Sequence, residues 1–534
     1  MSKFDLTIKN YRCFEDKNPL RLTIQDGFIA LVGPNNSGKS SCLKFFYELR
    51  NIWSSLSNNI ESLLRLSNEQ NRYGFDYVDV FDKNEVYNDD NNREMSVEIE
   101  LKDVASNNEI DCVTKIIFYC DRTWWRAKLY QGHNHDDISA YNLKSDKSYG
   151  EIIFYTDRKL EQVFYVDCSK FLQLFKSLAT CCYIGPFRNV ITEGEADYFD
   201  LTIGSKFISQ WNDWKTGSVK SNNKLIEKVT RDIENIFEFK SLEINSSESL
   251  NTLQVLIEGK PYKLKELGAG ISQFIVVLAN IAIKKPDYVL IDEPELNLHP
   301  SLQLDFLTTI GSYTSKSVIF ATHSIGLSRS VADRVYSFSR KLNDTKVKSL
   351  ERQDNYAEYL GELSYSSYRE IGCQSVLLVE GVKDVKTVQQ FLRKFKKDHK
   401  VVILPLGGDQ LAVGGTEQEL AELKRLSEDI YVLVDSERIS ENSPICGKRQ
   451  QFKKACDELG FNVHLTAYRA IENYFTDNAV KSVKGGEYKA LKPYEKLSES
   501  CAPWGKHENW KIAREMTLEE IYQTDIGKFL SSIQ

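Results

Sequence analysis

The sequence GPNNSGKS at residues 33–40 has the glycine, lysine and serine spacing of a loop that binds phosphate groups. Gly33 and Gly38 let the backbone turn so that consecutive N–H groups point at phosphate oxygens, and the helix expected to begin near Lys39 adds its positive end. Lys39 should reach the β and γ phosphates of ATP, and the Ser40 hydroxyl should ligate Mg²⁺. Further nucleotide contacts are expected from three neighbours in the loop, Asn35, Asn36 and Ser41.

The sequence YVLIDEPELNLHP at 288–300 supplies the acidic residues that would complete such a site. Its apolar run predicts a buried strand with Asp292 at the tip, where the carboxylate can hold magnesium through water. Glu293 is then placed to polarise the attacking water. His323 follows the apolar strand expected at 317–321 and is expected to sense the γ-phosphate. Together, the three motifs predict ATP binding and hydrolysis.

Carboxylates also gather in a second region, at the ends of other expected strands. Glu380 ends an apolar run that begins at residue 375, and Asp384 follows one turn into the next helix. A strand at 430–434 delivers Asp435 and Glu437, which would lie on the same side of an extended chain. In a parallel sheet these strand ends converge at one edge, where carboxylates that repel one another require cations. Hard oxygen ligands suit Mg²⁺ or Mn²⁺, and a pair of such ions can cleave a phosphodiester.

Two further residues are candidates for this second site. Glu472, in RAIENYF, is expected at another strand end as an additional ligand or catalytic carboxylate. Lys506, in WGKHENWK, could stabilise the developing charge on a phosphate, with Lys511 as the competing choice. An exposed surface lysine is the alternative interpretation of both positions.

The elements that must position these residues predict an α/β fold with a split ATPase domain. Strands at 4–9, 20–23 and 28–32 and a helix at 40–49 are separated from the acidic strand by a long insertion. We predict a P-loop ATPase head at 1–340 with a helical insertion at about 55–250, a linker at 341–369, and a metal-dependent domain with a parallel sheet at 370–534. Apolar residues between 225 and 237 share one helix face, which makes a candidate dimerisation helix near 220–240 or packs on its own domain.

Composition limits the classes of protein that fit these motifs. The 534 residues are 41% apolar and 27% charged, as in an ordinary protein with a core. No apolar stretch approaches the roughly 20 residues of a membrane span, and the N-terminus has no secretory pattern. The eleven cysteines form no CxxC pair and are odd in number, which argues against a disulfide framework. We therefore expect a cytoplasmic protein with no membrane partner.

The net charge of −7 does not favour nucleic-acid binding by itself. Two basic runs, at 393–400 and 448–454, lie in the half of the chain that carries the second carboxylate set. Short charge runs usually form solvated helix faces, but their position keeps a nucleic-acid role open.

The first set of motifs resembles the ATP-binding cassette superfamily, specifically its SMC-like branch, in which EPE followed by LHP is characteristic. The resemblance implies that two heads sandwich ATP and that each receives the signature helix of the other. The candidate signature is LGAGISQ at 267–273, in which Gly268 and Gly270 would approach the γ-phosphate. Gly268 stands where the family has serine, which leaves the rate of hydrolysis open.

The second set of motifs resembles the TOPRIM domain of topoisomerases, primases and certain nucleases. Its first glutamate maps onto Glu380, and its DxD maps onto Asp435 and Glu437 as a DxE variant. An SMC-like ATPase followed by TOPRIM is similar to the OLD (overcoming lysogenization defect) nucleases. That resemblance implies a homodimer or tetramer formed through ATPase heads that nicks or cleaves DNA with divalent metal, frequently in antiphage defence. It also implies regulation by ATP and, in some members, a helicase partner or a retron reverse transcriptase with its RNA–DNA.

Three alternatives stay open. A topoisomerase or primase would use a tyrosine nucleophile in a separate domain or a zinc site, and no motif here indicates either. A non-cleaving, ATP-dependent clamp or sensor would use the second domain only to bind nucleic acid. RNA is the remaining alternative substrate, because the cleavage chemistry acts on the phosphate whichever sugar carries it.

Overall fold

The computed structural model describes residues 3–58, 60–67, 73–102, 111–131, 136–137, 143–145, 151–155, 163–186, 197–247, 251–296, 298–341, 344–350, 375–398, 401–406 and 429–533. Contacts divide the chain into two compact units. Unit 1 comprises Met1–Asn297, Thr309–His323 and Arg334–Leu350, and unit 2 comprises Leu298–Thr308, Ser324–Asp333 and Glu351–Gln534. Two segments of the predicted 1–340 head therefore belong to unit 2 by their contacts.

The nucleotide-binding part of unit 1 is a mainly parallel sheet. Its strand order is β11 (Cys182–Ile184), β17 (Tyr288–Asp292), β18 (Ser317–Thr322), β3 (Gly27–Val32), β19 (Arg334–Lys341) and β20 (Asp344–Leu350). The residues of β17 and β18 are all buried, which explains their continuous apolar sequences. Because parallel strands end at one edge, the segments that follow β3, β17 and β18 are brought to the same side. The predicted strands of the ATPase core are confirmed.

Strand β20 falls within the predicted linker at 341–369, so the start of that prediction is wrong. The strand pairs antiparallel with β19 and completes the edge of the sheet. The later part of the predicted linker, from residue 351, lies outside the described residues.

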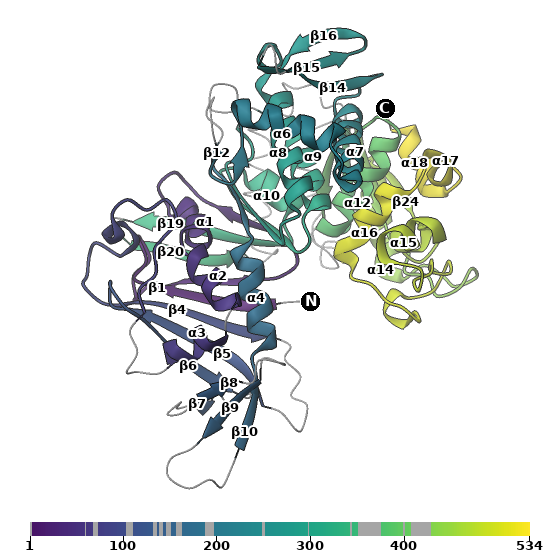
Figure 1. Ribbon diagram of the computed structural model, residues 1–534. Coiled ribbons are helices and arrows are strands. Elements are labelled where there is room, and N and C mark those ends of the chain that lie inside the picture. The colour runs from purple at the N-terminus through teal and green to yellow at the C-terminus, as the bar shows by residue number, and fades with distance from the viewer. Residues whose placement is uncertain are drawn as a thin grey trace. The chain divides into compact units, whose positions relative to one another are not determined.

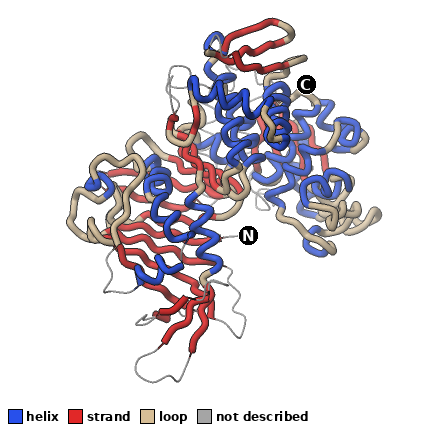
Figure 2. The backbone as a smooth tube through the Cα atoms, in the orientation of Figure 1, coloured by secondary structure: helices blue, strands red, loops and turns tan. Residues whose placement is uncertain are grey.

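Unit 1 contains a second, larger sheet, so the prediction that the insertion is helical is wrong. The main path of this sheet is β2 (Leu20–Ile24), β1 (Lys3–Lys9), β4 (Met95–Lys102), β5 (Asp111–Cys120), β10 (Val163–Asp167), β9 (Glu151–Tyr155) and β8 (Leu143–Ser145). Off this path, β6 (Trp125–Gln131) pairs with β5, and β7 (Asp136–Asp137) pairs with β6. Side chains of β1 and β4 alternate between buried and partly exposed, as expected for strands with one face on a core. Much of the insertion is thus strand (Figure 2).

Helices cover one face of this sheet. They are α2 (Arg50–Asn58), α3 (Ile60–Ser67) and α4 (Ser169–Ala179), and Figure 1 shows α2 beside α4 on the sheet. Helix α1 (Lys39–Glu48), which precedes α2, packs on β11, β17 and β18 of the nucleotide-binding sheet. Trp53 of α2 stacks on Phe175 of α4 with their ring centroids 5.7 Å apart. This aromatic contact joins residues from either side of the strand-rich insertion and fixes α1, which begins at the phosphate loop.

The remaining elements of unit 1 precede the acidic strand β17. They are the short 3₁₀ helices η1 (Lys83–Val86) and η2 (Leu264–Glu266), the strands β12 (Asp197–Tyr198), β13 (Leu201–Thr202), β14 (Leu242–Ser247), β15 (Thr252–Ile257) and β16 (Lys260–Lys263), and the helices α6 (Gly204–Thr216), α7 (Lys220–Ile236) and α8 (Ala269–Lys284).

The apolar face of α7 is buried within unit 1. Ile226, Val229 and Ile233 are at most 1% exposed, and Asp232 on the same helix accepts a 2.6 Å hydrogen bond from the Tyr313 hydroxyl. The interpretation that this face packs on its own domain is therefore confirmed, and the alternative, that this face of the helix near 220–240 forms a dimer contact, is wrong.

Unit 2 contains a parallel sheet in the order β22 (Val401–Pro405), β21 (Ser375–Val379), β23 (Asp429–Val434) and β24 (Asn462–Leu465). Alternate residues of β21 face two different cores: Leu377 packs with residues of α12 (Val382–Lys394), and Leu378 with residues of α14 (Gly447–Glu458). The sheet is thus covered on both faces, and its carboxyl edge is left for polar residues.

The other helices of unit 2 are α15 (Asp477–Lys484), α16 (Asn509–Glu515), α17 (Leu518–Tyr522) and α18 (Asp525–Ser532), with the 3₁₀ helices η5 (Ile471–Tyr474), η6 (Leu497–Glu499) and η7 (Lys506–Glu508). Within the described part of the chain, no helix has the length and apolar character needed to cross a membrane.

Helix α12 also explains why two segments of the predicted head group with unit 2. The segments belong to α9 (Pro300–Tyr313) and α10 (Ile325–Val331) and the residues beside them. Buried Lys386 of α12 lies 3.2 Å from the carboxylate of Asp333. Arg393 forms an ion pair with buried Asp305, to which Gln389 also donates a 2.5 Å hydrogen bond. Charges buried in this way need their partners nearby, so the segments stay with α12.

Candidate nucleotide and carboxylate sites

The phosphate loop of unit 1 connects β3 to α1 and has no room for side chains at its glycines. A Cβ added to Gly33 would lie 2.2 Å from the carbonyl oxygen of Phe338. Gly38 has a φ of +99°, and a Cβ there would lie 2.7 Å from Cys13 Sγ. Gly38 also precedes α1 without any side-chain cap, so the first N–H groups of the helix are available to an anion.

Lys39 occupies the inside of this loop. Its Nζ donates hydrogen bonds to the carbonyl oxygens of Gly33 at 2.7 Å and Pro34 at 2.9 Å. Burial lowers the pKa of Lys39, and the charge of Asp292 is the largest of the effects that oppose this. The ammonium is thus held where the phosphates of a nucleotide would replace carbonyl oxygens as its partners.

Asp292 and Ser40 lie together, as predicted for a magnesium site. Burial raises the pKa of Asp292, and a hydrogen bond from the Ser40 side chain opposes the rise. Asp292 is 3% exposed, and its Oδ1 is buried without a hydrogen-bond partner. A buried carboxylate oxygen without a partner beside a hydroxyl fits Mg²⁺.

Glu293 and His323 also meet. His323 Nε2 lies 3.1 Å from Glu293 Oε1, and the Glu293 backbone has a φ of 52° with its N–H bonded to the Ala321 carbonyl oxygen. Glu295 holds the next strand end, because its Oε1 accepts hydrogen bonds from the Thr322 hydroxyl at 2.7 Å and the His323 N–H at 2.8 Å. Glu295 is absent from the predicted site, although the second glutamate of EPE was the signal that could have identified it.

The remaining predicted nucleotide contacts differ in their surroundings. Asn35 and Asn36 are exposed, and Arg340 Nη1 donates to Asn36 Oδ1 at 3.3 Å. Ser41 forms a hydrogen bond with Cys13. Gly268 and Gly270 lie at the start of α8, and a Cβ at exposed Gly268 would meet no atom within 4 Å. Their contact with the nucleotide of a second head stays a prediction.

The carboxylates of unit 2 gather at the carboxyl edge of the parallel sheet. Glu380 follows β21, Asp435 follows β23, and Asp384 lies in the first turn of α12, where its Oδ2 accepts a 2.9 Å hydrogen bond from the Gly381 N–H. Burial raises the pKa of Asp384 to about 7, and the charge of Glu380 adds to the rise. Burial and the charges of Asp384 and Glu380 likewise raise the pKa of Asp435. These acidic groups are close enough to oppose one another's ionisation.

Glu472 and Lys506 belong to the same cluster. Glu472 is not at a strand end as predicted but in the 3₁₀ helix η5, whose Ile471 N–H donates a 3.0 Å hydrogen bond to Asp435 Oδ1. Lys506 Nζ lies 2.8 Å from Glu472 Oε1. Burial lowers the pKa of Lys506, but the charge of Glu472 and the hydrogen bond to it outweigh this effect and raise the pKa. The competing Lys511 lies over the ring of Trp510.

Glu437 lines the same pocket as Glu472 and Lys506, but its backbone and side chain are held by Arg469. Its φ of 54° turns the chain, so the extended geometry expected for the DxE pair is wrong. The Glu437 N–H donates to the Arg469 carbonyl oxygen at 3.0 Å, and the side chains of the two residues form an ion pair. Glu437 is also not among the principal charges that raise the pKa of Asp435.

Some carboxylate oxygens of the cluster are available to a metal, but others are paired with positively charged side chains of the protein. Glu380 Oε2 and Glu472 Oε2 are buried without hydrogen-bond partners, which fits a hard divalent ion. However, Arg449 Nη2 lies 2.6 Å from Glu380 Oε1, in addition to the pair between Glu472 and Lys506. Across the described residues, no three acidic, histidine or cysteine side chains form a group that could hold a metal ion as they stand. A metal bound here would compete with Arg449 for Glu380 and with Lys506 for Glu472.

Arg449 and Arg469 were missed as site residues. Arg449 lies within the basic run at 448–454, which indicated a solvated helix face, whereas its side chain is buried against Glu380. Arg469 is the first residue of the RAIENYF segment that was singled out for Glu472. Only the fold shows that each guanidinium is paired with a predicted ligand.

Comparisons with known proteins bear on the ATPase part. Residues 4–181 and 188–327 match the family described as AAA ATPase domain. No curated protein matches the chain.

Three solved structures to which the chain is similar are SMC heads. One is an SMC head bound to the C-winged helix domain of ScpA (13% identity, 66% of this chain and 98% of that chain, TM-score 0.37). Another is the SMC head domain from Thermotoga maritima (14% identity, 66% and 100%, TM-score 0.31). The third is a head domain with an extended coiled coil, bound to the C-terminal domain of ScpA and derived from Pyrococcus furiosus (11% identity, 68% and 100%, TM-score 0.34).

The family match covers more than half of the 534 residues and includes the phosphate loop, Asp292, Glu293 and His323. The chain therefore belongs to the family of AAA ATPase domains.

Proposed function

We propose that the protein is an ATP-regulated, divalent-metal-dependent DNA endonuclease of the OLD kind, with an SMC-like ATPase head and a TOPRIM nuclease domain. The observation that carries the proposal is the carboxylate cluster of buried Asp435 and Glu472 and partly buried Glu380 and Asp384, beside Lys506. The cluster lies at the carboxyl edge of a parallel sheet, in one chain with an ATPase site. This combination suits a phosphodiester as substrate more than it suits any neutral one.

In the ATPase part, Lys39 would bind the β and γ phosphates, while Ser40 and Asp292 would hold Mg²⁺. Glu293 would orient and polarise water, with its carboxylate fixed by His323. Gly268 and Gly270 of a second copy would complete the site, so ATP would join two heads into a homodimer or part of a tetramer.

In the nuclease part, Glu380, Asp384 and Asp435 would hold Mg²⁺ or Mn²⁺, with Glu472 and Glu437 as further oxygen ligands. A bound divalent metal would supply an activated water and neutralise charge on the scissile phosphate. Lys506 would turn from Glu472 to the phosphate and stabilise the charge that develops there. Arg449 would be released from Glu380 in the same step and could contact a neighbouring phosphate.

The substrate proposed is DNA, with RNA as a variant. Antiphage defence follows from the resemblance to OLD nucleases, as does a partner such as a helicase or a retron reverse transcriptase with its RNA–DNA. The observations on this chain support the chemistry and leave these partners as proposals.

The test is to incubate plasmid, single-stranded DNA and RNA with the purified chain, with and without Mn²⁺ or Mg²⁺ and ATP. We expect DNA cleavage that requires the metal, stops when a chelator is added and changes in rate with ATP. Intact DNA under every condition would contradict the proposal.

A second candidate is a non-cleaving, ATP-dependent nucleic-acid clamp or sensor. It is favoured by the pairs of Glu380 with Arg449 and Glu472 with Lys506, since carboxylates neutralised by protein cations have no need of metal. This function would be supported by ATP-dependent binding of DNA or RNA without cleavage in the same assay.

A further inference from the structure

A pocket of about 490 Å³ lies beside the carboxylate cluster of unit 2. Glu472 and Lys506, which belong to the cluster, also line the pocket. Whatever occupies the pocket would therefore lie next to the group that reacts at the cluster. The volume is within the range of pockets that enclose small organic ligands, roughly 300–1,000 Å³.

Part of the pocket is apolar. Ala470, Leu497, Pro503 and Trp504 contribute to its lining. The indole N–H of Trp504 donates a 3.0 Å hydrogen bond to Asn509 Oδ1, so the ring is fixed and offers carbon surface to the pocket. A flat aromatic ligand would bury more apolar area here than a sugar or a phosphate alone.

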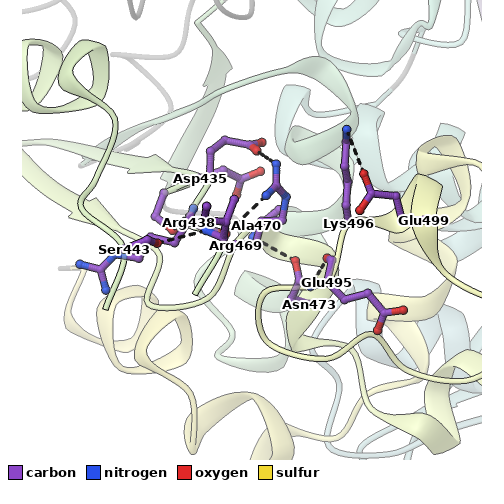
Figure 3. Close-up of polar contacts among 12 residues, drawn as sticks. Asp435, Arg438, Ser443, Arg469, Ala470, Asn473, Glu495, Lys496 and Glu499 are labelled. Atoms are coloured by element: carbon purple, nitrogen blue, oxygen red, sulfur yellow. Dashed lines mark hydrogen bonds and ion pairs between the residues drawn. The ribbon is translucent and has the colours of Figure 1, made fainter. Parts of the chain in front are cut away.

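Charged residues and Ser498 form the rest of the lining, and the charged residues include the carboxylates of Glu437 and Glu472 as well as three cations. Arg469, Lys496 and Lys506 each lie in the pocket lining, and each is paired with a carboxylate, from Glu437, Glu499 and Glu472 respectively. Figure 3 shows Asp435, Arg469 and Lys496 in this region, with the contact of Lys496 to Glu499 as a dashed line. Cations beside an apolar wall suit a ligand that joins a flat ring to a phosphate, which is the chemistry of a nucleotide.

A base that remains paired and stacked in a duplex cannot enter a pocket of about 490 Å³, because its partner base and neighbours stay attached. We propose that this pocket, the nucleotide pocket, binds one unpaired nucleotide of the substrate beside the phosphate that is cut. The protein would thus prefer single-stranded or locally unpaired nucleic acid. The inference rests on the proposed nuclease function for its position in the reaction, but the binding itself does not require cleavage.

The binding test uses the full-length chain with chelator, so that no strand is cut. The probe is a single-stranded DNA oligonucleotide with one 2-aminopurine, whose fluorescence falls when the base stacks on an aromatic ring. Ser498, which is exposed and lines the pocket, is replaced in Ser498→Trp to fill the space without removing core packing. Ser482→Trp is the matched control, since Ser482 is exposed on α15 and not part of the lining.

We expect the wild-type chain to quench the probe and to bind it at least about tenfold more tightly than Ser498→Trp, in line with the loss of one stacked base. Ser482→Trp should stay within about twofold of wild type, and the fully paired duplex of the same sequence should bind more weakly than the single strand. A thermal unfolding scan checks that the variants fold. If Ser498→Trp does not fold, Lys496→Ala serves instead, with weaker binding and a smaller salt dependence expected.

Unchanged binding and quenching in Ser498→Trp, or tighter binding of the duplex, would overturn the inference. Complete displacement of the oligonucleotide by an equal concentration of a nucleoside monophosphate would also overturn it, because the pocket would then serve a free nucleotide. Failure of the nuclease function gives a different pattern, in which the pocket binds the probe but wild type cuts nothing. If wild type cuts and Ser498→Trp cuts single strands equally well, the nuclease proposal stands and the pocket inference fails.

Discussion

The two acidic sites of this chain differ in what their carboxylates bind. In the ATPase site, Asp292 contacts the Ser40 hydroxyl and Glu293 lies by His323, while the nearby Lys39 ammonium donates its hydrogen bonds to backbone carbonyl oxygens. In unit 2, Glu380 and Glu472 are each paired with a full positive charge, from Arg449 and Lys506. The first site has a carboxylate oxygen free for the metal of a nucleotide, whereas in the second a bound cation would compete with Arg449 and Lys506. This difference offers a physical route to regulation, since the second site is at rest when its own cations are in place.

The largest expected effect comes from Asp435→Asn, which keeps the shape of the side chain and removes its charge. We expect cleavage to fall by roughly 10²–10³-fold, the size seen when one preorganised electrostatic group is lost. Binding of ATP should be unchanged, because Asp435 lies in the other unit. Cleavage rates with Mn²⁺ and nucleotide-binding isotherms measure both. Full activity of the variant would remove the cluster from the reaction.

Lys39→Ala tests nucleotide binding at the ATPase site. The buried ammonium is held inside the phosphate loop, so its loss should weaken ATP binding by roughly 10–100-fold, as expected for hydrogen bonds to a charged group. Equilibrium binding of labelled ATP measures the change, and Lys83→Ala, at an exposed surface pair, is the control. Equal ATP affinity in the two variants would show that the loop does not bind phosphate.

The pH dependence of stability tests whether the second site is electrostatically unfavourable without metal. Folded Asp384 keeps its proton up to about pH 7, whereas in the unfolded chain it loses it at about pH 4. Between these values the folded state binds more protons, so this group makes the free energy of unfolding fall as the pH rises. Denaturant unfolding of the chain with chelator measures the slope, and Asp384→Asn should reduce it. Stability that rises equally with pH in both proteins would contradict the assignment.

The smallest effect is expected from Glu437→Gln. Glu437 is already paired with Arg469, and such partly exposed pairs contribute little. Cleavage should fall by less than about tenfold, well below the effect of Asp435→Asn. If the two variants lose equal activity, Glu437 leaves Arg469 and acts as a full member of the metal site.

Much of the framework could be predicted from the sequence, because buried parallel strands are continuous apolar runs and the acidic residues follow directly. Asp292, Glu380 and Asp435 are found at strand ends for this reason. The prediction of a helical insertion was wrong, although the segment MSVEIELK at 95–102 has the alternating pattern of a half-buried strand. A turn at a single residue, as at Glu437, leaves no periodic signal.

Ion pairs between residues that are far apart in the sequence could not be predicted from the sequence. The basic run at 393–400 suggested a solvated surface, yet Arg393 binds buried Asp305, and Lys397 Nζ donates a 2.5 Å hydrogen bond to the Ser531 carbonyl oxygen. Arg449 in the second run is likewise buried against Glu380. Net charge and charge runs describe how many cations a segment has, but the fold decides which of them face solvent.

Helix α12 has a practical consequence for separating the two activities. A fragment that ends near residue 350 would keep Asp305 and Asp333 but lose Arg393 and Lys386, and a fragment that begins near residue 370 would have the reverse defect. Leaving a buried charge without its partner lowers the stability of the folded state by about 3–5 kcal/mol. Point substitutions in the intact polypeptide, and not truncation, are therefore the sound way to silence one activity while keeping the other.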